Sequence, residues 1–325
     1  ENPLGFPLGF PLGFPLGFPL GFPPGLTSPP CHSRCRGAMA GPRPLVAVGQ
    51  VTSTPDKEQN WAACAGLVRE AARRGACLVC LPEGFDYIGC DTAQTLRLAE
   101  PLDGPLMGRY AQLARDCGVW LSLGGFHERG QDWETTRRIY NCHALLEPTG
   151  RLVAAYRKTH LCDVELEGRV TMRESSFTNP GTEIVPPVST PAGKLGLSIC
   201  YDLRFPEISL ALRRAGAEIL TYPSAFTVPT GSAHWEVLLR ARAIESQCYV
   251  VAAAQTGKNH EHRMSYGHAL VVDPWGAVVA QCHEGTGLCY AEIDLEYLHR
   301  VRREIPVNNH RRPDLYGTVA APLAP

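Results

Sequence analysis

Residues 194–207 have the sequence Lys-Leu-Gly-Leu-Ser-Ile-Cys-Tyr-Asp-Leu-Arg-Phe-Pro-Glu. The apolar run at its start is typical of a buried strand. Pro206 and Glu207 are typical of the first turn of a helix, where proline has no hydrogen bond to lose and an acid meets the positive end of the dipole. Cys200 lies between strand and helix. We therefore expect its thiol at the carboxyl edge of a sheet, where open α/β sheets bind ligands.

A thiol in that position has two interpretations. A helix N-terminus or a nearby cation would lower the pKa of Cys200 and make the thiol a nucleophile. Taken alone, the residue fits a buried structural cysteine better, because unpaired cysteines are commonly buried. The remainder of the chain decides between the two.

The composition excludes several classes of protein. The chain has 325 residues and a formal net charge of −1, so neither nucleic acid nor a membrane surface is an expected partner. It contains no run of about 18 apolar residues, the length that crosses a membrane. Its 13 cysteines have no repeating spacing, which in a chain of this length indicates reduced thiols and a cytoplasmic location.

The start of the chain differs from the rest, because the unit Pro-Leu-Gly-Phe occurs there five times. A proline at every fourth position excludes a helix. We expect a disordered low-complexity segment over residues 1–43, a folded domain over 44–317 and a disordered tail over 318–325. The first residue is not methionine, which favours a fragment or an unusual upstream translation. The segment between Asn2 and Thr54 contains arginines but no acidic residue, which leaves a mitochondrial location open as an alternative.

The segment after the repeats predicts a βαβ unit. Residues 45–51 are an apolar run, and Thr54 and Pro55 predict the N-cap and the first turn of a helix. A second apolar run covers residues 76–81. Strand, helix and strand in this order imply a parallel pair with a right-handed crossover.

Three later turns predict antiparallel pairs. Each has proline in its second position and glycine in its fourth, the pattern of a type I turn between strands. The turns are Glu147–Gly150, Thr190–Gly193 and Asp273–Gly276. Residues 249–254 predict one further strand. The fold is therefore expected to be α/β with parallel and antiparallel pairs in mixed sheets.

Two groups of potential metal ligands are interpreted as structural. Cys77 and Cys80 are three residues apart, so on a strand they face opposite sides, and no second pair follows at metal spacing. His260, His262 and His268 straddle a loop without a carboxylate cage. We predict no metal site and no cofactor.

Three residues with reactive side chains, Glu83, Lys158 and Cys200, each follow a predicted strand. Alone, Glu83 and Lys158 fit solvated surface residues. Together, a carboxylate can take the thiol proton, an ammonium can stabilise an oxyanion, and the thiolate can form a covalent acyl intermediate. The backbone N–H of Tyr201 is a second candidate donor to that oxyanion. The coincidence favours a nucleophilic site without histidine.

Three blocks of the sequence resemble the signature blocks of the nitrilase superfamily of carbon–nitrogen hydrolases, in the same order. They are Leu81-Pro82-Glu83, residues 156–161 and residues 199–207. The resemblance runs from Leu45 to Tyr316. It implies a four-layer αββα sandwich of mixed sheets, hydrolysis of a small-molecule amide by glutamate, lysine and cysteine, and a homodimer or a higher homo-oligomer.

The same resemblance implies roles for single residues. Glu83 matches the general base, Lys158 the oxyanion stabiliser or proton donor, and Cys200 the nucleophile. Glu174 matches a second carboxylate that positions Lys158. Arg204 is implied to bind a substrate carboxylate, with a structural ion pair as the alternative. Aromatic residues that line the pocket or simply pack in the core are Tyr222, Phe226 and Trp235.

The sequence around Tyr222, Gly231 and Asn308 resembles one branch of the superfamily. That branch is implied to hydrolyse the amide between a 2-oxoglutaryl group and cysteinylglycine, and release of ammonia from 2-oxoglutaramate is the alternative. Two further classes stay open. One is a scaffold or signalling protein with vestigial catalytic residues, and the other is a peroxide-reducing thiol, which would need a resolving cysteine that the sequence near Cys200 does not offer.

Overall fold

A computed structural model describes residues 43–166 and 170–318 of the chain. The Pro-Leu-Gly-Phe repeats lie outside the described residues, as does the expected tail beyond residue 318. Within the described ranges, none of the helices has the length and apolar character needed to span a bilayer.

The larger sheet has eight strands in the described part of the chain. Its order is β13-β12-β1-β2-β3-β4-β5, and β16 also pairs with β1. β1, β2 and β3 are parallel, whereas β3, β4 and β5 are antiparallel. The bounds are β1 Leu45–Val51, β2 Ala76–Leu81, β3 Trp120–Glu128, β4 Tyr140–Leu146, β5 Leu152–Arg157, β12 Ala254–His260, β13 Arg263–Tyr266 and β16 Gly287–Glu292.

The second sheet has six strands in the order β15-β14-β11-β10-β9-β8. β9, β10 and β11 are parallel, β8 and β14 pair with them antiparallel, and β15 pairs antiparallel with β14. The bounds are β8 Val188–Thr190, β9 Gly193–Leu197, β10 Ile219–Thr221, β11 Tyr249–Ala252, β14 Leu270–Val272 and β15 Val278–Gln281. A separate hairpin pairs β6 Asp163–Leu166 with β7 Val170–Arg173.

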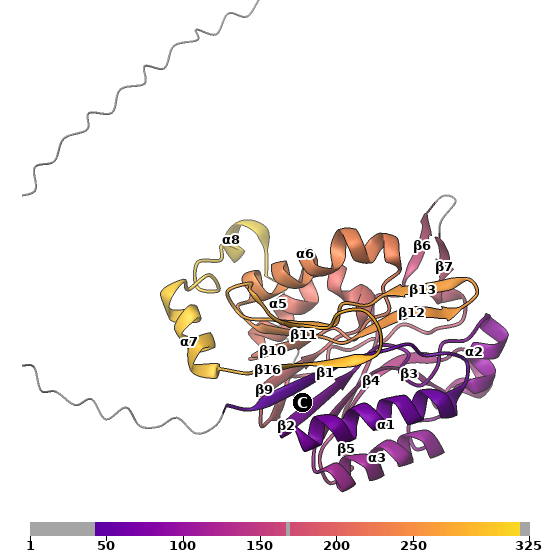
Figure 1. The fold of residues 1–325 in the computed structure, drawn as a ribbon. Coiled ribbons are helices and arrows are strands. Elements are labelled where there is room, and N and C mark those ends of the chain that lie inside the picture. The colour runs from indigo at the N-terminus through magenta and orange to yellow at the C-terminus, as the bar shows by residue number, and fades with distance from the viewer. Residues whose placement is uncertain (1–42, 167–169, 319–325) are drawn as a thin grey trace, which may run out of the picture. The chain divides into compact units, whose positions relative to one another are not determined.

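Helices cover the outer faces of both sheets (Figure 1). α1 Lys57–Arg73 and α3 Pro105–Cys117 pack on the larger sheet, and α5 Pro206–Arg214 and α6 Val228–Ser246 pack on the second. The layers are therefore helix, sheet, sheet and helix, as predicted. The other helices are α2 Thr92–Leu98, α4 Trp133–Thr136, α7 Leu295–Glu304 and α8 Pro313–Tyr316, with 3-10 turns at Glu174–Ser176 and Cys200–Arg204.

The alternation of side chains along β2 explains why this strand carries core on both faces. Leu78 and Cys80 belong to the cluster between the two sheets, while Val79 and Leu81 belong to the cluster under α1 and α3. Successive side chains of a strand point to opposite faces. A strand that is buried on both faces therefore appears as an unbroken apolar run in the sequence.

The structure confirms the three predicted turns and corrects two local predictions. α1 begins at Lys57, because the Asp56 carboxylate, and not Thr54, accepts the N–H groups of Glu58 and Gln59. The run 249–254 is not one strand. The chain leaves the second sheet after β11 and enters the larger one with β12, a change of partner that an apolar run does not signal.

A histidine is fully buried between the two sheets. His143 on β4 donates from Nδ1 to the carbonyl of Ser198, 3.0 Å away, and its Nε2 accepts from the Ser122 hydroxyl, 2.7 Å away. Burial lowers the pKa of His143 to about 4. Because Ser198 lies two residues before Cys200, this neutral ring ties the larger sheet to the strand end that leads to the thiol.

The buried ring predicts an acid-sensitive fold. In the unfolded chain a histidine has its ordinary pKa of about 6.5, so protons bind the unfolded state preferentially as the pH falls toward 4. Above about pH 6.5, the burial of neutral His143 does not reduce the free energy of unfolding. By pH 4 this residue alone lowers it by about 3 kcal/mol. Urea unfolding at several pH values across this range should show that His143→Gln loses less free energy of unfolding than the wild type does. The exposed His310→Gln serves as control, and equal slopes in all three proteins would contradict the assignment.

Candidate active site

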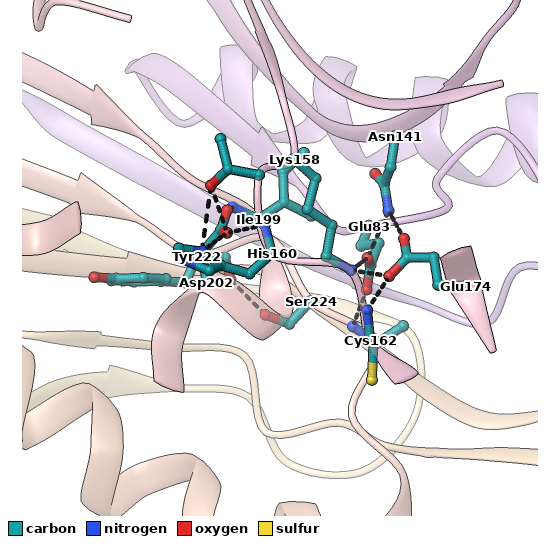
Figure 2. Close-up of polar contacts among 12 residues, drawn as sticks. Glu83, Asn141, Lys158, His160, Cys162, Glu174, Ile199, Asp202, Tyr222 and Ser224 are labelled. Carbon is teal, nitrogen blue, oxygen red and sulfur yellow. Dashed lines mark hydrogen bonds and ion pairs between the residues drawn. The ribbon is translucent and has the colours of Figure 1, made fainter. Parts of the chain in front are cut away.

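Three loops bring the reactive side chains together. Glu83 follows β2, Lys158 follows β5 directly, and Cys200 follows β9. Lys158 Nζ donates to Glu83 Oε1 at 3.0 Å and to Glu174 Oε2 at 2.8 Å (Figure 2). The Cys200 thiol lies near enough to the Glu83 carboxylate for each group to shift the pKa of the other. The structure thus brings all four residues into one connected group.

Neutral donors complete the surroundings of the two carboxylates. Asn141 on β4 donates from Nδ2 to Glu83 at 2.9 Å and to Glu174 at 3.0 Å. The backbone N–H of Ala225 donates to Glu83 Oε2, and that of Cys162 donates to Glu174 Oε2. Buried carboxylates are stable only when their oxygens are paired in this way. Figure 2 shows Asn141 and Lys158 approaching the two carboxylates from different elements.

The charges in this group stabilise one another. Burial alone would raise the pKa of Glu83, but the Lys158 ammonium and the hydrogen bonds from Cys200, Lys158 and Asn141 outweigh it and lower that pKa to about 2. Burial would likewise lower the pKa of Lys158, but Glu174 and Glu83 hold it well above its usual value. The resting site therefore contains two carboxylates and one ammonium.

The thiol does not behave as expected from the sequence. Burial, followed by the negative charge of Glu83, raises the pKa of Cys200 well above the usual value, and Lys158 offsets this only in part. The prediction of a lowered thiol pKa is wrong, because desolvation and the adjacent carboxylate outweigh the cation. Cys200 rests as a neutral thiol whose proton has an ionised carboxylate as its partner.

The backbone at Cys200 is strained. Its φ is +44°, in the left-handed region that residues with a side chain adopt rarely, and its N–H is held by the carbonyl of Pro223 at 3.0 Å. Tyr201 follows in the first turn of the 3-10 segment, where N–H groups point away from the preceding chain. The strained turn thereby presents the thiol and an N–H group together.

Asp202 connects this turn to the segment that carries Lys158. Its carboxylate is fully buried and accepts from the Ile199 N–H at 2.9 Å and the Tyr156 hydroxyl at 2.8 Å. It also accepts from Nδ1 of His160 at 2.7 Å (Figure 2). Because Tyr156 and His160 flank Lys158, the network fixes the position of the ammonium relative to the thiol.

Gly125 leaves room for the Glu83 loop. It lies in β3 with φ +66°, and a Cβ there would come within 2.6 Å of the Glu83 Cα. Its carbonyl accepts the N–H of Gly84 at 3.1 Å. Close approach of these two backbones requires a residue without a side chain.

A cavity of about 1190 Å³ opens onto the reactive group. Besides Glu83, Lys158, Glu174 and Cys200, it is lined by three of the predicted binding residues, which are Tyr201, Arg204 and Phe226. Its other walls come from the loop before α2, the β6–β7 hairpin and the β12–β13 hairpin. The volume is that of a site for a small molecule.

Two predicted binding residues lie elsewhere. Tyr222 is fully buried with its hydroxyl bonded to Ser209, and Trp235 is buried with its Nε1 donating to the carbonyl of His268 at 2.8 Å. Neither is among the described residues that line the cavity. Both pack in the core, because each aromatic ring finds its polar partner inside the fold.

Asn141 was missed by reasoning from the sequence. Its one signal is an amide within the apolar run of β4, since a buried amide requires hydrogen-bond partners. In the described ranges, no group of three or more His, Cys, Asp or Glu side chains is arranged to hold a metal ion.

Known proteins resemble this chain in sequence. The family model for carbon-nitrogen hydrolases matches residues 45–303. The deaminated glutathione amidase of Homo sapiens is 69% identical over 281 residues, which are 86% of each chain. The protein of that name in Dictyostelium discoideum is 46% identical, over 83% of this chain and 94% of its own.

Solved structures resemble the fold as well. The crystal structure of the Caenorhabditis elegans NitFhit protein matches with a TM-score of 0.81 and 50% identity, over 86% of this chain and 68% of that one. Saccharomyces cerevisiae Nit3, a member of the nitrilase superfamily, matches with a TM-score of 0.73 and 32% identity, over 83% and 97%.

The close approach at Gly125 yields a stability prediction. Gly125→Ala should lower the free energy of unfolding by about 1–3 kcal/mol, because the Cβ meets the Glu83 backbone at an unfavourable φ. Urea denaturation measures this. Gly66→Ala in α1 is the matched control, since a Cβ there meets nothing within 4 Å, and it should be stabilising by up to about 1 kcal/mol. The same loss in both variants would refute the role of Gly125.

Proposed function

Because the chain belongs to the carbon–nitrogen hydrolase family, we propose that it hydrolyses deaminated glutathione, 2-oxoglutaryl-cysteinylglycine, to 2-oxoglutarate and cysteinylglycine. It is an amide-hydrolysing enzyme, and relatives at 67–69% identity carry the name deaminated glutathione amidase. The observation that carries the mechanism is the convergence of Cys200, Glu83 and Lys158 on one cavity, with the Lys158 ammonium hydrogen-bonded to the Glu83 carboxylate.

Acylation starts from the neutral thiol. Glu83 takes the proton of Cys200 as the sulfur attacks the amide carbonyl carbon, and the carbonyl π electrons move to the oxygen. An ionised carboxylate in contact with the thiol can do this without a preformed thiolate. The high pKa of Cys200 is thus compatible with catalysis, because proton transfer and attack occur at the same site.

Lys158 is suited to stabilise the oxyanion. An ammonium has three protons, and Glu83 and Glu174 accept two of them. The third is left for the substrate oxygen, and the backbone N–H of Tyr201 is the second proposed donor. When the oxyanion collapses, the C–N bond breaks and the departing amine takes the proton from Glu83. A thioester on Cys200 remains.

Deacylation uses the same carboxylate again. Glu83 takes a proton from water as the water oxygen attacks the thioester carbon, and the C–S bond then breaks. The sulfur recovers the proton and 2-oxoglutarate leaves. Glu174 has a positioning role in this cycle. While Glu83 is protonated, Glu174 still compensates the charge of Lys158, so the ammonium stays in place for the second step.

2-Oxoglutaramate stays a second candidate substrate, because it contains the same acyl group. A scaffold or signalling role with vestigial residues is less favoured, since the complete reactive group is assembled in one cavity. A cytoplasmic location, with a mitochondrial one as alternative, remains part of the proposal.

A homodimer is likewise proposed. Val237 and Ile244 on α6 and Trp275 beside them are exposed apolar side chains, and clusters of this kind mark contact surfaces.

Replacing the nucleophile tests the covalent route. Cys200→Ala should lower kcat for deaminated glutathione by about 10³-fold or more, because the variant lacks the proposed nucleophile of the acyl intermediate. Thermal unfolding should show that the variant folds. Cys117→Ala, on α3 and outside the cavity lining, is the control and should keep its rate. Substantial turnover by Cys200→Ala would exclude the thioester.

Replacing the base tests the proton transfers. Glu83→Gln should lower kcat by about 10²–10⁴-fold, since the amide cannot accept the thiol proton. Glu165→Gln removes an exposed carboxylate outside the cavity lining and should leave kcat unchanged. Steady-state kinetics with deaminated glutathione compare the two. Equal rates for both variants would assign the base to a different residue.

A further inference from the structure

The cavity carries more positive charge than the reaction needs. Of its described acidic residues, Glu83 and Glu174 are paired with Lys158, which leaves Asp91. Of its described basic residues, three remain beyond Lys158, namely Arg173, Arg204 and Arg263. An excess of guanidinium groups on the walls of a cavity favours a ligand with more than one negative charge.

The substrate proposed above has two carboxylates on opposite sides of the scissile amide. One belongs to the 2-oxo acid, which stays on the enzyme as the thioester. The other is the glycine carboxylate of the departing dipeptide. Two separate cationic positions are therefore required. Arg204 belongs to the 3-10 turn of Cys200 and is suited to the first, which leaves the second to be assigned.

Arg263 at the start of β13 is held beside the catalytic carboxylate. Its guanidinium donates to the carbonyl of Ala225 at 3.4 Å, and the N–H of Ala225 donates to Glu83 Oε2 at 3.1 Å. The β12–β13 hairpin, which carries Arg263, makes a second hydrogen bond to the loop that contains Ala225. Here the Tyr266 N–H donates to the carbonyl of Phe226 at 2.9 Å. The guanidinium therefore lies on the segment that orients Glu83.

Buried hydrogen bonds also hold the hairpin that carries Arg263. Ser265 donates to Asn259 Oδ1 at 2.7 Å, and Asn259 Nδ2 donates to the carbonyl of Ser53 at 2.9 Å. All three of these residues are buried. A side chain carried by such a hairpin is preorganised, which lowers the entropy lost when a ligand binds.

Arg263 has no carboxylate within ion-pair distance among the described residues, although it is half-buried in the cavity wall. The other candidate, Arg173, is exposed and is the cross-strand neighbour of Asp163, a carboxyl group whose pKa it helps to lower. Arg204 contacts His234 and lies over the rings of Tyr201 and Phe226. Among the described residues neither Arg204 nor Arg263 has an anionic partner, and with Arg204 suited to the 2-oxo acid, Arg263 is left for the second carboxylate.

We propose that Arg263 binds the glycine carboxylate of the departing cysteinylglycine and so makes the enzyme prefer deaminated glutathione to amides without that group. The assignment rests on the proposed function. A guanidinium can donate two parallel hydrogen bonds to a carboxylate, which fixes the leaving group as well as attracting it. The contact is absent for 2-oxoglutaramate, whose leaving group is ammonia.

The experiment compares three substrates in three proteins. The substrates are 2-oxoglutaryl-cysteinylglycine, its glycinamide, which lacks only the distal charge, and 2-oxoglutaramate. The proteins are the wild type, Arg263→Gln and Arg173→Gln, which removes the rival cation of the cavity lining. Steady-state kinetics give kcat/KM for each pair, and thermal unfolding checks that the variants fold.

Arg263→Gln should lower kcat/KM for the dipeptide acid by about 10- to 100-fold, mainly through KM, as expected for loss of a hydrogen-bonded charge pair. The same variant should change the glycinamide and 2-oxoglutaramate values by less than about twofold, and the wild type should discriminate against the glycinamide by the 10- to 100-fold factor. Arg173→Gln should keep the wild-type preference for the dipeptide acid over its glycinamide, because Arg173 is not the residue assigned to the glycine carboxylate.

An equal loss on all three substrates in Arg263→Gln would overturn the assignment, because the residue would then act on the fold or on Glu83. If Arg173→Gln lost the preference for the dipeptide acid over the glycinamide and Arg263→Gln kept it, the glycine carboxylate would be assigned to Arg173. A wild-type enzyme that hydrolyses 2-oxoglutaramate but not the dipeptide acid would overturn the proposed substrate and this assignment together. That outcome differs visibly from the first two, in which the wild type is active on the dipeptide acid.

Discussion

The ammonium of Lys158, buried between the carboxylates of Glu83 and Glu174, is the interaction on which the rest of the site depends. Three charges out of water are tolerated only when they are paired with one another and the carboxylate oxygens are hydrogen-bonded. Those partners come from distant parts of the chain, through the Asn141 amide and the N–H groups of Ala225 and Cys162. The loops that end the strands are therefore held in one arrangement, and that arrangement brings the thiol of Cys200 to the base. Folding and the assembly of the reactive group are one event here.

The same arrangement determines how Cys200, the proposed nucleophile, is activated. Many reactive cysteines rest as thiolates beside a cation. In this site the cation is already shared by two carboxylates, so its effect on Cys200 is weaker than the effects of burial and of Glu83. The thiol stays protonated until the substrate arrives. A strained backbone at Cys200 and the buried network around Asp202 then keep sulfur, base and ammonium in place, so that little reorganisation is needed during the reaction.

The sequence was sufficient to predict that Glu83, Lys158 and Cys200 lie together, because each follows an apolar run and the ends of strands meet at sheet edges. Glu174 followed only from a family resemblance, since its loop has no periodic pattern. Asn141 was beyond reach, because its role appears only when β4 is placed beside two loops. For Tyr222 and Trp235 the sequence left pocket and core both open, and the structure places them in the core, since an aromatic ring near a strand end can face the core as easily as a cavity. The prediction of a lowered pKa for Cys200 was wrong for a similar reason, because burial is a property of the fold and leaves no local sign in the sequence. The division of residues 249–254 between two sheets depends on pairing partners far away in the chain.

The central claim is that sulfur, carboxylate and ammonium act together through a covalent acyl intermediate. Its most direct test is mass spectrometry of the intact protein and its peptides, quenched in acid at increasing times after mixing with 2-oxoglutaryl-cysteinylglycine. The account predicts the mass of one 2-oxoglutaryl group on the peptide that contains Cys200, appearing with the release of cysteinylglycine and disappearing as 2-oxoglutarate forms. Turnover during which Cys200 stays unmodified at every time, or an acyl group found on a different residue, would contradict it.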